Sequence, residues 1–333
     1  MVIRGDQQEY GTDYLETYSP TVRAESIRLV AAFAAHHGLD LWQQDVEQAF
    51  LCADPGVNPS DPLNSRMVYL RPPKSFRNGN DHYWLMLTAP YGLRQGPKLF
   101  NMWMAEKLKQ CGFKQVSVEP CLWVNLEASP PVLLGQQVDD ILVAATKEAN
   151  DRLVDMLREL NVPISVNQRA KLFCSIEFRK NANGSHTLSQ EGYFKRIIAE
   201  HGYEKTNVKK SPMDTSGRRE PDDDDHLSVN DHARYRSAVG ALMYGSTMTR
   251  PDISFAMSQL SRHLQAPIKK HLRDLERVFG YIKGTIDFGI TFGGDVTKVI
   301  PPAIENDDLY FFVDSLHGDA NLERKGTTGW IVM

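Results

Sequence analysis

The chain has 333 residues, of which 41% are hydrophobic, so it can fill the cores of two or three domains. Lys and Arg number 38 against 42 Asp and Glu, a formal charge of −4, so a role with nucleic acid must rest on local basic surfaces. Four widely spaced cysteines without a CxxC pair argue against a zinc site or a disulfide framework and favour an intracellular setting. No apolar run approaches the roughly 20 residues of a membrane span, so no membrane partner is expected.

The first half of the chain predicts a helix, a strand, a polar loop, two short strands and an amphipathic helix. In order, these occupy residues 19–38, 39–51, 53–65, 66–73, 82–88 and 98–112. Ser19 is suited to cap the first helix, Pro20 to its first turn and Gly38 to its end. The last helix places Phe100 and Met104 on one apolar face, which indicates that this face is buried.

The second half predicts further strands and then mostly helices. Strands are expected at residues 121–126, 131–137, 138–145, 171–180 and 186–189, and helices at residues 146–160, 193–202, 235–248, 251–264 and 271–284. Residues 211–231, with the acidic run Asp222–Asp225, predict a linker, and residues 309–333 predict a hairpin. Because the steady βαβα rhythm of a doubly wound sheet is missing, we expect an α+β fold with an antiparallel sheet and helices packed on one face.

Two adjacent aspartates, Asp139 and Asp140, lie between apolar runs in the stretch GQQVDDILVAATK. A buried carboxylate costs several kcal/mol unless it is paired or bound to a metal. Asp45 adds a third carboxylate at the end of another strand with apolar flanks. Three carboxylates at strand ends can hold two Mg²⁺ ions, which stabilise the attacking and leaving oxygens of a phosphoryl transfer. A DD dipeptide alone is more often a solvated turn, so this hypothesis depends on its context.

Several blocks in register resemble the reverse transcriptase of copia-type LTR retrotransposons, and the resemblance covers almost the whole chain. The blocks are DYLETYSPTVRAESIRLVAAFAAHHGLDLWQQDVEQAFL, VYLRPP, APYGLRQGPKLFNMWM, GFKQVSVEPCLW, VDDILVAA, TRPDI and YIKGT. The resemblance implies right-hand polymerase fingers, palm and thumb over residues 1–215, with shortened fingers and an antiparallel palm sheet. It also implies a linker and connection region over residues 216–300 and a truncated RNase H-like hairpin over residues 301–333.

The resemblance further implies roles for single residues. The catalytic carboxylates and ligands of Mg²⁺ (or Mn²⁺) are Asp45, Asp139 and Asp140, with the backbone carbonyl of Val46 as a further ligand. The residues implied to contact the incoming nucleotide are Gln48, Ala49, Phe50, Arg94, Gln95 and Gly96. Phe50 takes the place of the aromatic gate that excludes a 2′-hydroxyl, although its pattern equally suits a core position, and Gln95–Gly96 equally suits a turn. Asp314 matches the first RNase H carboxylate, but the remaining ones are missing, so ribonuclease activity is not expected.

The sequence departs from the family pattern at two places near the aspartates. Gln137 stands where the family has an aromatic residue, and Cys174–Ser175 replaces a Leu-Gly pair in the block that precedes Ile176. Family members also carry fingers strands upstream of Arg4. These departures leave room for a second hypothesis beside the polymerase.

The resemblance implies an RNA-directed DNA polymerase that joins a dNTP to a primer 3′-hydroxyl by two-metal nucleotidyl transfer. The alternative is a degenerate, catalytically inactive transposon fragment that at most binds nucleic acid. Residues 195–219 hold seven Lys or Arg against three Asp or Glu, which gives the local basic surface that a template–primer duplex needs. The expected partners are a primed RNA or DNA template, dNTPs and other polyprotein products, in the cytoplasm (within a virus-like particle) or in the nucleus.

Overall fold

The computed structural model describes residues 2–53, 69–77, 82–214 and 226–293, and the backbone of residues 311–316 and 327–332. The chain forms two compact units, Met1–Gly293 and Gly294–Met333. Most of the predicted loop after residue 53 and the acidic run Asp222–Asp225 lie outside the described residues. The fold is mixed, with helices and antiparallel sheets, as the sequence predicts.

A six-stranded antiparallel sheet forms the centre of the first unit. Its strands are β1 (Asp40–Val46), β4 (Lys114–Val116), β5 (Glu119–Asn125), β6 (Val132–Gln137), β7 (Asp140–Ala145) and β8 (Ile164–Arg169). They lie in the order β4-β5-β6-β7-β1-β8, so β1 is an internal strand between β7 and β8. The sequence did not predict β8, because most of its residues are polar and exposed and its extended form comes from pairing with β1.

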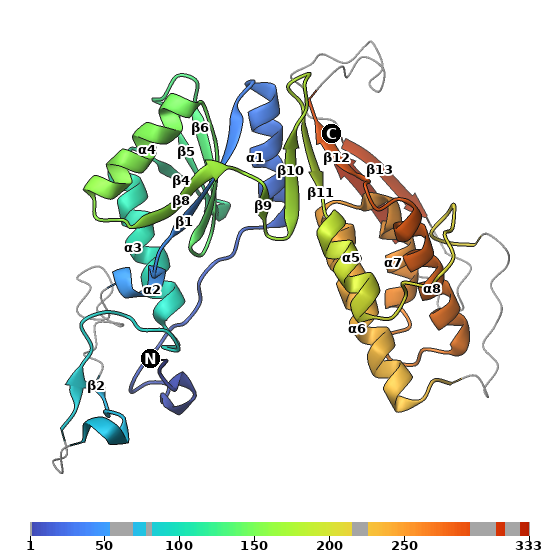
Figure 1. Cartoon of the computed structure of the whole chain (residues 1–333), viewed down its shortest axis with the longest axis horizontal. Helices are drawn as coiled ribbons and strands as arrows, with labels where there is room; N and C mark the ends of the chain where they lie inside the picture. Colours follow the sequence, from blue (N-terminus) through green and yellow to red (C-terminus); the bar gives the residue numbers. More distant parts are fainter. Residues whose placement is uncertain are drawn as a thin grey trace. The chain divides into compact units, whose positions relative to one another are not determined.

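Helices cover both faces of this sheet, so the expectation of one covered face was wrong. Helix α1 (Ala24–His36) lies on one side, and α3 (Gly96–Gln110) and α4 (Lys147–Glu159) lie on the other (Figure 1). Strand β7 shows why: Ile141 and Val143 pack with α3 and α4, whereas Leu142 and Ala144 pack with α1. A strand that is buried on both faces has a continuous run of apolar residues, and residues 141–145 of β7, ILVAA, form such a run.

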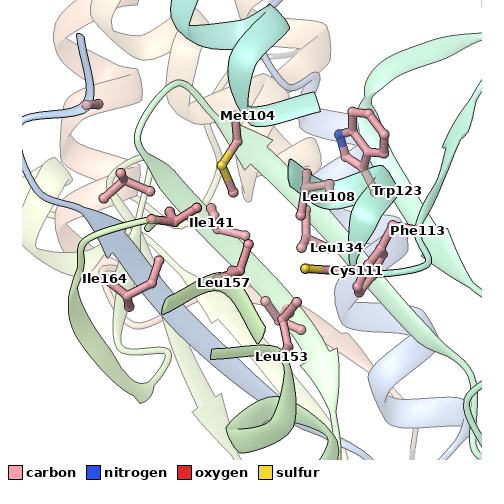
Figure 2. Packing of buried hydrophobic residues seen from close by; sticks show 14 of the residues in the cluster. Met104, Leu108, Cys111, Phe113, Trp123, Leu134, Ile141, Leu153, Leu157 and Ile164 are labelled. Atoms are coloured by element: carbon pink, nitrogen blue, oxygen red, sulfur yellow. The ribbon is translucent and has the colours of Figure 1, made fainter. Parts of the chain in front are cut away.

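The core between the sheet and helices α3 and α4 is tightly built from long apolar side chains. Met104 from α3 and Leu157 from α4 both point toward Ile141, with Leu134 beside them (Figure 2). All four of these side chains are fully buried. This core fixes β6 and β7, and with them the turn that carries the two adjacent aspartates.

Two boundaries differ from the sequence expectation. Helix α1 begins at Ala24 and not near Ser19, and Arg23 occupies the N-cap position without a side-chain cap. The preceding residues are instead held by a tertiary contact, because the backbone N–H of Val22 donates to the side chain of Gln137. Gly38 ends the helix as predicted, with a φ of +66°.

Strand β1 ends at Val46, earlier than predicted. The following residues form a one-turn helix, α2 (Ala49–Cys52), which Gln48 precedes in a left-handed conformation. The predicted strands at residues 66–73 and 82–88 are reduced, among the described residues, to β2 (Tyr69–Leu70) and β3 (Trp84–Leu85), which pair antiparallel.

A second, four-stranded sheet follows in the chain. It contains β9 (Leu172–Phe173), β10 (Ile176–Lys180), β11 (His186–Ser189) and β12 (Gly289–Phe292), in the order β12-β11-β10-β9. Helices α5 (Glu191–Glu200), α6 (Val229–Met248), α7 (Ser254–Ser261) and α8 (Lys269–Gly284) share a separate apolar cluster. In the second unit, β13 (Phe311–Leu316) and β14 (Thr327–Val332) pair antiparallel, as the sequence predicts.

No helix within the described residues is long and apolar enough to cross a membrane.

The TRPDI and YIKGT blocks meet in this helical cluster around one buried cation. Arg250 is 1% exposed, and its guanidinium donates to the carboxylate of Asp252 at 2.8–3.2 Å. The same guanidinium donates to the carbonyl and hydroxyl oxygens of Thr285, and Tyr281 donates its hydroxyl to Asp252. These two blocks therefore hold α8 against the turn before α7, which is a structural role.

Candidate active site

The pairing of β1 with β7 places Asp45 directly opposite Asp140. Alternate residues of a strand share a face, so both carboxylates lie on the face that α1 covers further along the sheet. Asp139 occupies the two-residue turn between β6 and β7, and its carbonyl accepts from the backbone N–H of Val46 at 3.1 Å. All three aspartates are half-buried. The strand pairing and the turn thus place the three aspartates that the sequence singled out next to one another along the backbone.

The three carboxylates act on one another electrostatically. Partial burial raises the pKa of Asp140, and the negative charges of Asp139 and Asp45 raise it further, while a hydrogen bond from Gln43 opposes the shift. Within the part of the chain that the structure describes, no group of three or more His, Cys, Asp or Glu side chains converges as a metal site. The three carboxylates do, however, offer only oxygen atoms, which is the donor type that hard divalent cations prefer.

Ser165 explains where the carboxylate of Asp45 points. Its hydroxyl donates to the Oδ2 atom of Asp45 at 2.7 Å and lies 3.3 Å from the Asp45 carbonyl oxygen. The pairing of β1 with β8 shifts register between Asp45 and Val46, and this irregularity brings Ser165 to the carboxylate. Sequence reasoning missed Ser165, because neither β8 nor its shift in register has a signal in the residue pattern.

Gln137, the residue in place of an aromatic ring, lies opposite Asp140 and has a hydrogen-bond partner. Its side-chain oxygen accepts from the backbone N–H of Val22 at 3.0 Å, which ties the segment before α1 to the edge of the site. The next residue, Val138, has a φ of +54°, a strained conformation for a β-branched residue. The strain lies in the turn that presents Asp139.

The turn between β9 and β10 is also strained. Cys174 and Ser175 have φ values of +50° and +58°, and Phe173 pairs with Ile176 on either side of them. A two-residue hairpin with both central residues at positive φ favours glycine or asparagine. Burial, together with the negative charge of Asp140, raises the pKa of the Cys174 thiol to about 11. The charge of Asp140 thus influences this turn electrostatically, where the sequence lacks the expected glycine.

The residues after β1 form a small aromatic cluster. Phe50 is half-buried, and its ring meets Tyr91 edge-on at 5.2 Å between centroids and Phe100 at 6.2 Å. Ala49 is buried, and Gln48 has a φ of +51°. Tyr91, which sequence reasoning did not select, is 41% exposed and lies against the predicted gate residue.

Arg94 and Gln95 contact the N-terminal segment around the short turn η1 (Gly5–Gln7). The guanidinium of Arg94 donates to the carbonyl of Gly5 at 2.5 Å and to the hydroxyl of Tyr14 at 2.8 Å. The Gln95 side chain, which is 6% exposed, accepts from Gln8 at 3.1 Å. Both side chains are thus engaged with this segment, and their predicted contacts with a nucleotide stay a prediction.

The remaining predicted site residues take these places. Gly96 is the first residue of α3, and its backbone N–H donates to the carbonyl of Leu93. Asp314 lies in β13 opposite Gly329, and its side chain is outside the described part of the chain. Neither position tests the role that the resemblance implies for it.

Comparison with known proteins places the chain in a family. Residues 1–215 match reverse transcriptase (RNA-dependent DNA polymerase). The chain is 31% identical over 294 residues to the retrovirus-related Pol polyprotein from transposon RE1 of Arabidopsis thaliana, covering 87% of the chain and 19% of the polyprotein. It is 27% identical over 342 residues to the corresponding polyprotein from transposon TNT 1-94 of Nicotiana tabacum, covering 99% of the chain and 24% of the polyprotein.

A third relative is shorter. The chain is 31% identical over 229 residues to a transposon Ty5-1 protein of Saccharomyces cerevisiae, covering 67% of the chain and 73% of that protein. The matches confirm the resemblance to copia-type retrotransposon proteins that the sequence blocks carry. The chain belongs to the reverse transcriptase family.

Proposed function

We propose that the chain is the RNA-directed DNA polymerase core of a copia-type retrotransposon. The observation that supports this most is the direct pairing of Asp45 with Asp140, with Asp139 in the adjoining turn. In this proposal the six-stranded sheet is the palm, the hairpin of β2 and β3 belongs to the fingers, and α5 begins the thumb. The substrates are a primed RNA or DNA template and a dNTP.

In the proposed reaction, the 3′-hydroxyl oxygen of the primer forms a bond to the α-phosphorus of the dNTP. The bond between that phosphorus and the bridging oxygen of pyrophosphate breaks, and the hydroxyl proton passes to water. Asp45, Asp139 and Asp140, with the carbonyl of Val46, would hold Mg²⁺ or Mn²⁺, which neutralises charge on the attacking and leaving oxygens. Ser165 would keep the Asp45 carboxylate in one orientation through its 2.7 Å hydrogen bond.

The nucleotide would lie beside Phe50, which the ring of Tyr91 supports edge-on. Phe50 would exclude a 2′-hydroxyl by bulk, and the backbone N–H groups of Gln48 and Ala49 would face the triphosphate. Arg94 and Gln95 would contribute to nucleotide binding through the N-terminal segment that they contact. Gly96 would contribute through its position at the start of α3.

The template–primer duplex would be held through its phosphates by basic residues of α5 and α8. Lys195 and Arg196 on α5 are exposed side chains, and Arg273 and Lys283 lie on α8. Other products of a Pol polyprotein are proposed partners, and the proposed setting is intracellular, within a cytoplasmic particle or the nucleus.

Primer extension on poly(rA)/oligo(dT) with Mg²⁺ tests this function. We expect the wild-type chain to incorporate dTMP and the Asp139→Asn variant to fall to background. Asp151→Asn is the matched control, because Asp151 lies on the surface of α4 in an ion pair with Lys147, and it should retain full incorporation. A folded wild-type chain that binds the duplex in a salt-dependent manner but incorporates no nucleotide would overturn the proposal and select the catalytically inactive alternative.

A further inference from the structure

A basic pocket lies at the end of β1 opposite to Asp45. Its cavity of about 490 Å³ is formed where the start of β1 meets the end of β8 and the hairpin of β10 and β11. The charged and titratable lining residues are Asp40, Arg169, Lys171, Arg179, Lys180 and His186. At about 3.3 Å per residue of strand, the pocket is roughly 16 Å from Asp45. It is therefore separate from the candidate active site.

The charges of this pocket do not balance. Asp40 is its one carboxylate, and its Oδ1 atom contacts both the Nζ atom of Lys180, at 2.7 Å, and the guanidinium of Arg169. Lys171 and Arg179 make no ion pair with another residue among those described. Burial lowers the pKa of Lys180, and the positive charge of the neighbouring Arg169 lowers it further.

Two of the four cations, Arg169 and Lys180, are held in place by local contacts. Lys180 also donates to the carbonyl of Leu39 at 3.2 Å, and His186, which is 2% exposed, donates its Nε2–H to the same oxygen at 3.0 Å. The guanidinium of Arg169 lies 4.3 Å from the ring centroid of Trp42. An anion entering the pocket would meet two cations, Arg169 and Lys180, that are already ordered, which lowers the cost of binding.

We propose that this pocket binds a phosphate group. Lys171, Arg179 and the outer N–H groups of Arg169 and Lys180 would donate charge-assisted hydrogen bonds to its oxygens. The phosphate belongs either to a free polyphosphate or to a nucleic-acid backbone, which share this chemistry. A simpler interpretation is that the pocket only joins the two sheets through the ion pairs of Asp40 with Arg169 and Lys180. That interpretation gives Lys171 and Arg179 no role. This difference defines the test, which does not depend on polymerase activity.

The test is calorimetric titration of the whole chain with inorganic pyrophosphate, in EDTA so that no divalent cation binds at the aspartates. The informative variant is Lys171→Ala with Arg179→Ala, which leaves every ion pair of Asp40 intact. Losing these two cations should weaken binding at least about ten-fold, since each would donate a charge-assisted hydrogen bond to the phosphate. The matched control, Lys109→Ala with Lys114→Ala, removes the same charge from α3 and β4 and should bind like the wild type.

Two arms distinguish the sources of the phosphate. If a short blunt DNA duplex competes with pyrophosphate for the pocket, the pocket binds backbone phosphates. If pyrophosphate binds and the duplex does not compete with it, the pocket binds a free polyphosphate. The proposal is overturned by a wild-type chain that shows no saturable binding, or by equal binding to the Lys171→Ala, Arg179→Ala variant.

Discussion

Asp140→Asn should stabilise the chain when no divalent cation is present. Asp140 lies directly opposite Asp45 and next to Asp139; burial raises its pKa, and the charges of Asp139 and Asp45 raise it further. Like charges directly opposite on paired strands cost about 0.2–1 kcal/mol, and the neighbouring Asp139 adds to this. Removing the charge of Asp140 should therefore raise the free energy of unfolding by on the order of 1 kcal/mol, or the melting temperature by roughly 2 °C.

The assay is thermal unfolding in EDTA at neutral pH, with Asp40→Asn as the control on the same sheet. Asp40 sits between Lys180 and Arg169, so its neutralisation should lower the melting temperature. Because the pKa of folded Asp140 is raised, its repulsion is complete at neutral pH and disappears as the pH falls through that raised pKa. The increase in melting temperature of Asp140→Asn over the wild type should become smaller over the same pH range. A less stable Asp140→Asn variant at neutral pH would refute the reasoning.

Three further changes test single contacts by urea unfolding. Ser175→Gly should stabilise the chain by about 0.5–1 kcal/mol, because glycine accepts positive φ without strain, and an unchanged midpoint would show that the turn is relaxed. Gln137→Phe restores an aromatic residue but should cost about 1 kcal/mol, since the N–H of Val22 loses its partner; equal stability would contradict that. Asp252→Ala should cost about 3 kcal/mol, because Arg250 is buried and loses its carboxylate, and a small effect would mean that Thr285 suffices.

The sequence predicted best the elements whose own pattern decides their structure. Helices α3 and α4 lie within two residues of their expected bounds, because apolar spacing is a local signal. Strand β8 and the start of α1 were missed, because pairing with β1 and the bond from Val22 to Gln137 decide them. Tertiary contacts of this kind cannot be inferred from the types or the spacing of the residues involved.

In the candidate active site, too, local sequence signals could be predicted and tertiary contacts could not. Asp45 and Asp140 could be selected from the sequence, since carboxylates between apolar runs are unusual, but their register required the paired strands. The bonds of Arg94 to Gly5 and Tyr14 could not be predicted, because they join segments about 80 or more residues apart through backbone and side-chain geometry. Resemblance indicated a nucleotide contact for Arg94, and the structure gives it a partner within the chain.

The place of β1 in the sheet has a consequence for synthesis on the ribosome. The strand that carries Asp45 emerges before its two neighbours, β7 and β8, which are both complete only when Arg169 has been added. At about 5–20 residues per second, this interval lasts on the order of ten seconds. During that time the strand, with Leu41, Trp42 and Val46, exposes unpaired backbone and apolar side chains. The nascent chain therefore needs protection from aggregation at the segment on which the proposed catalysis depends.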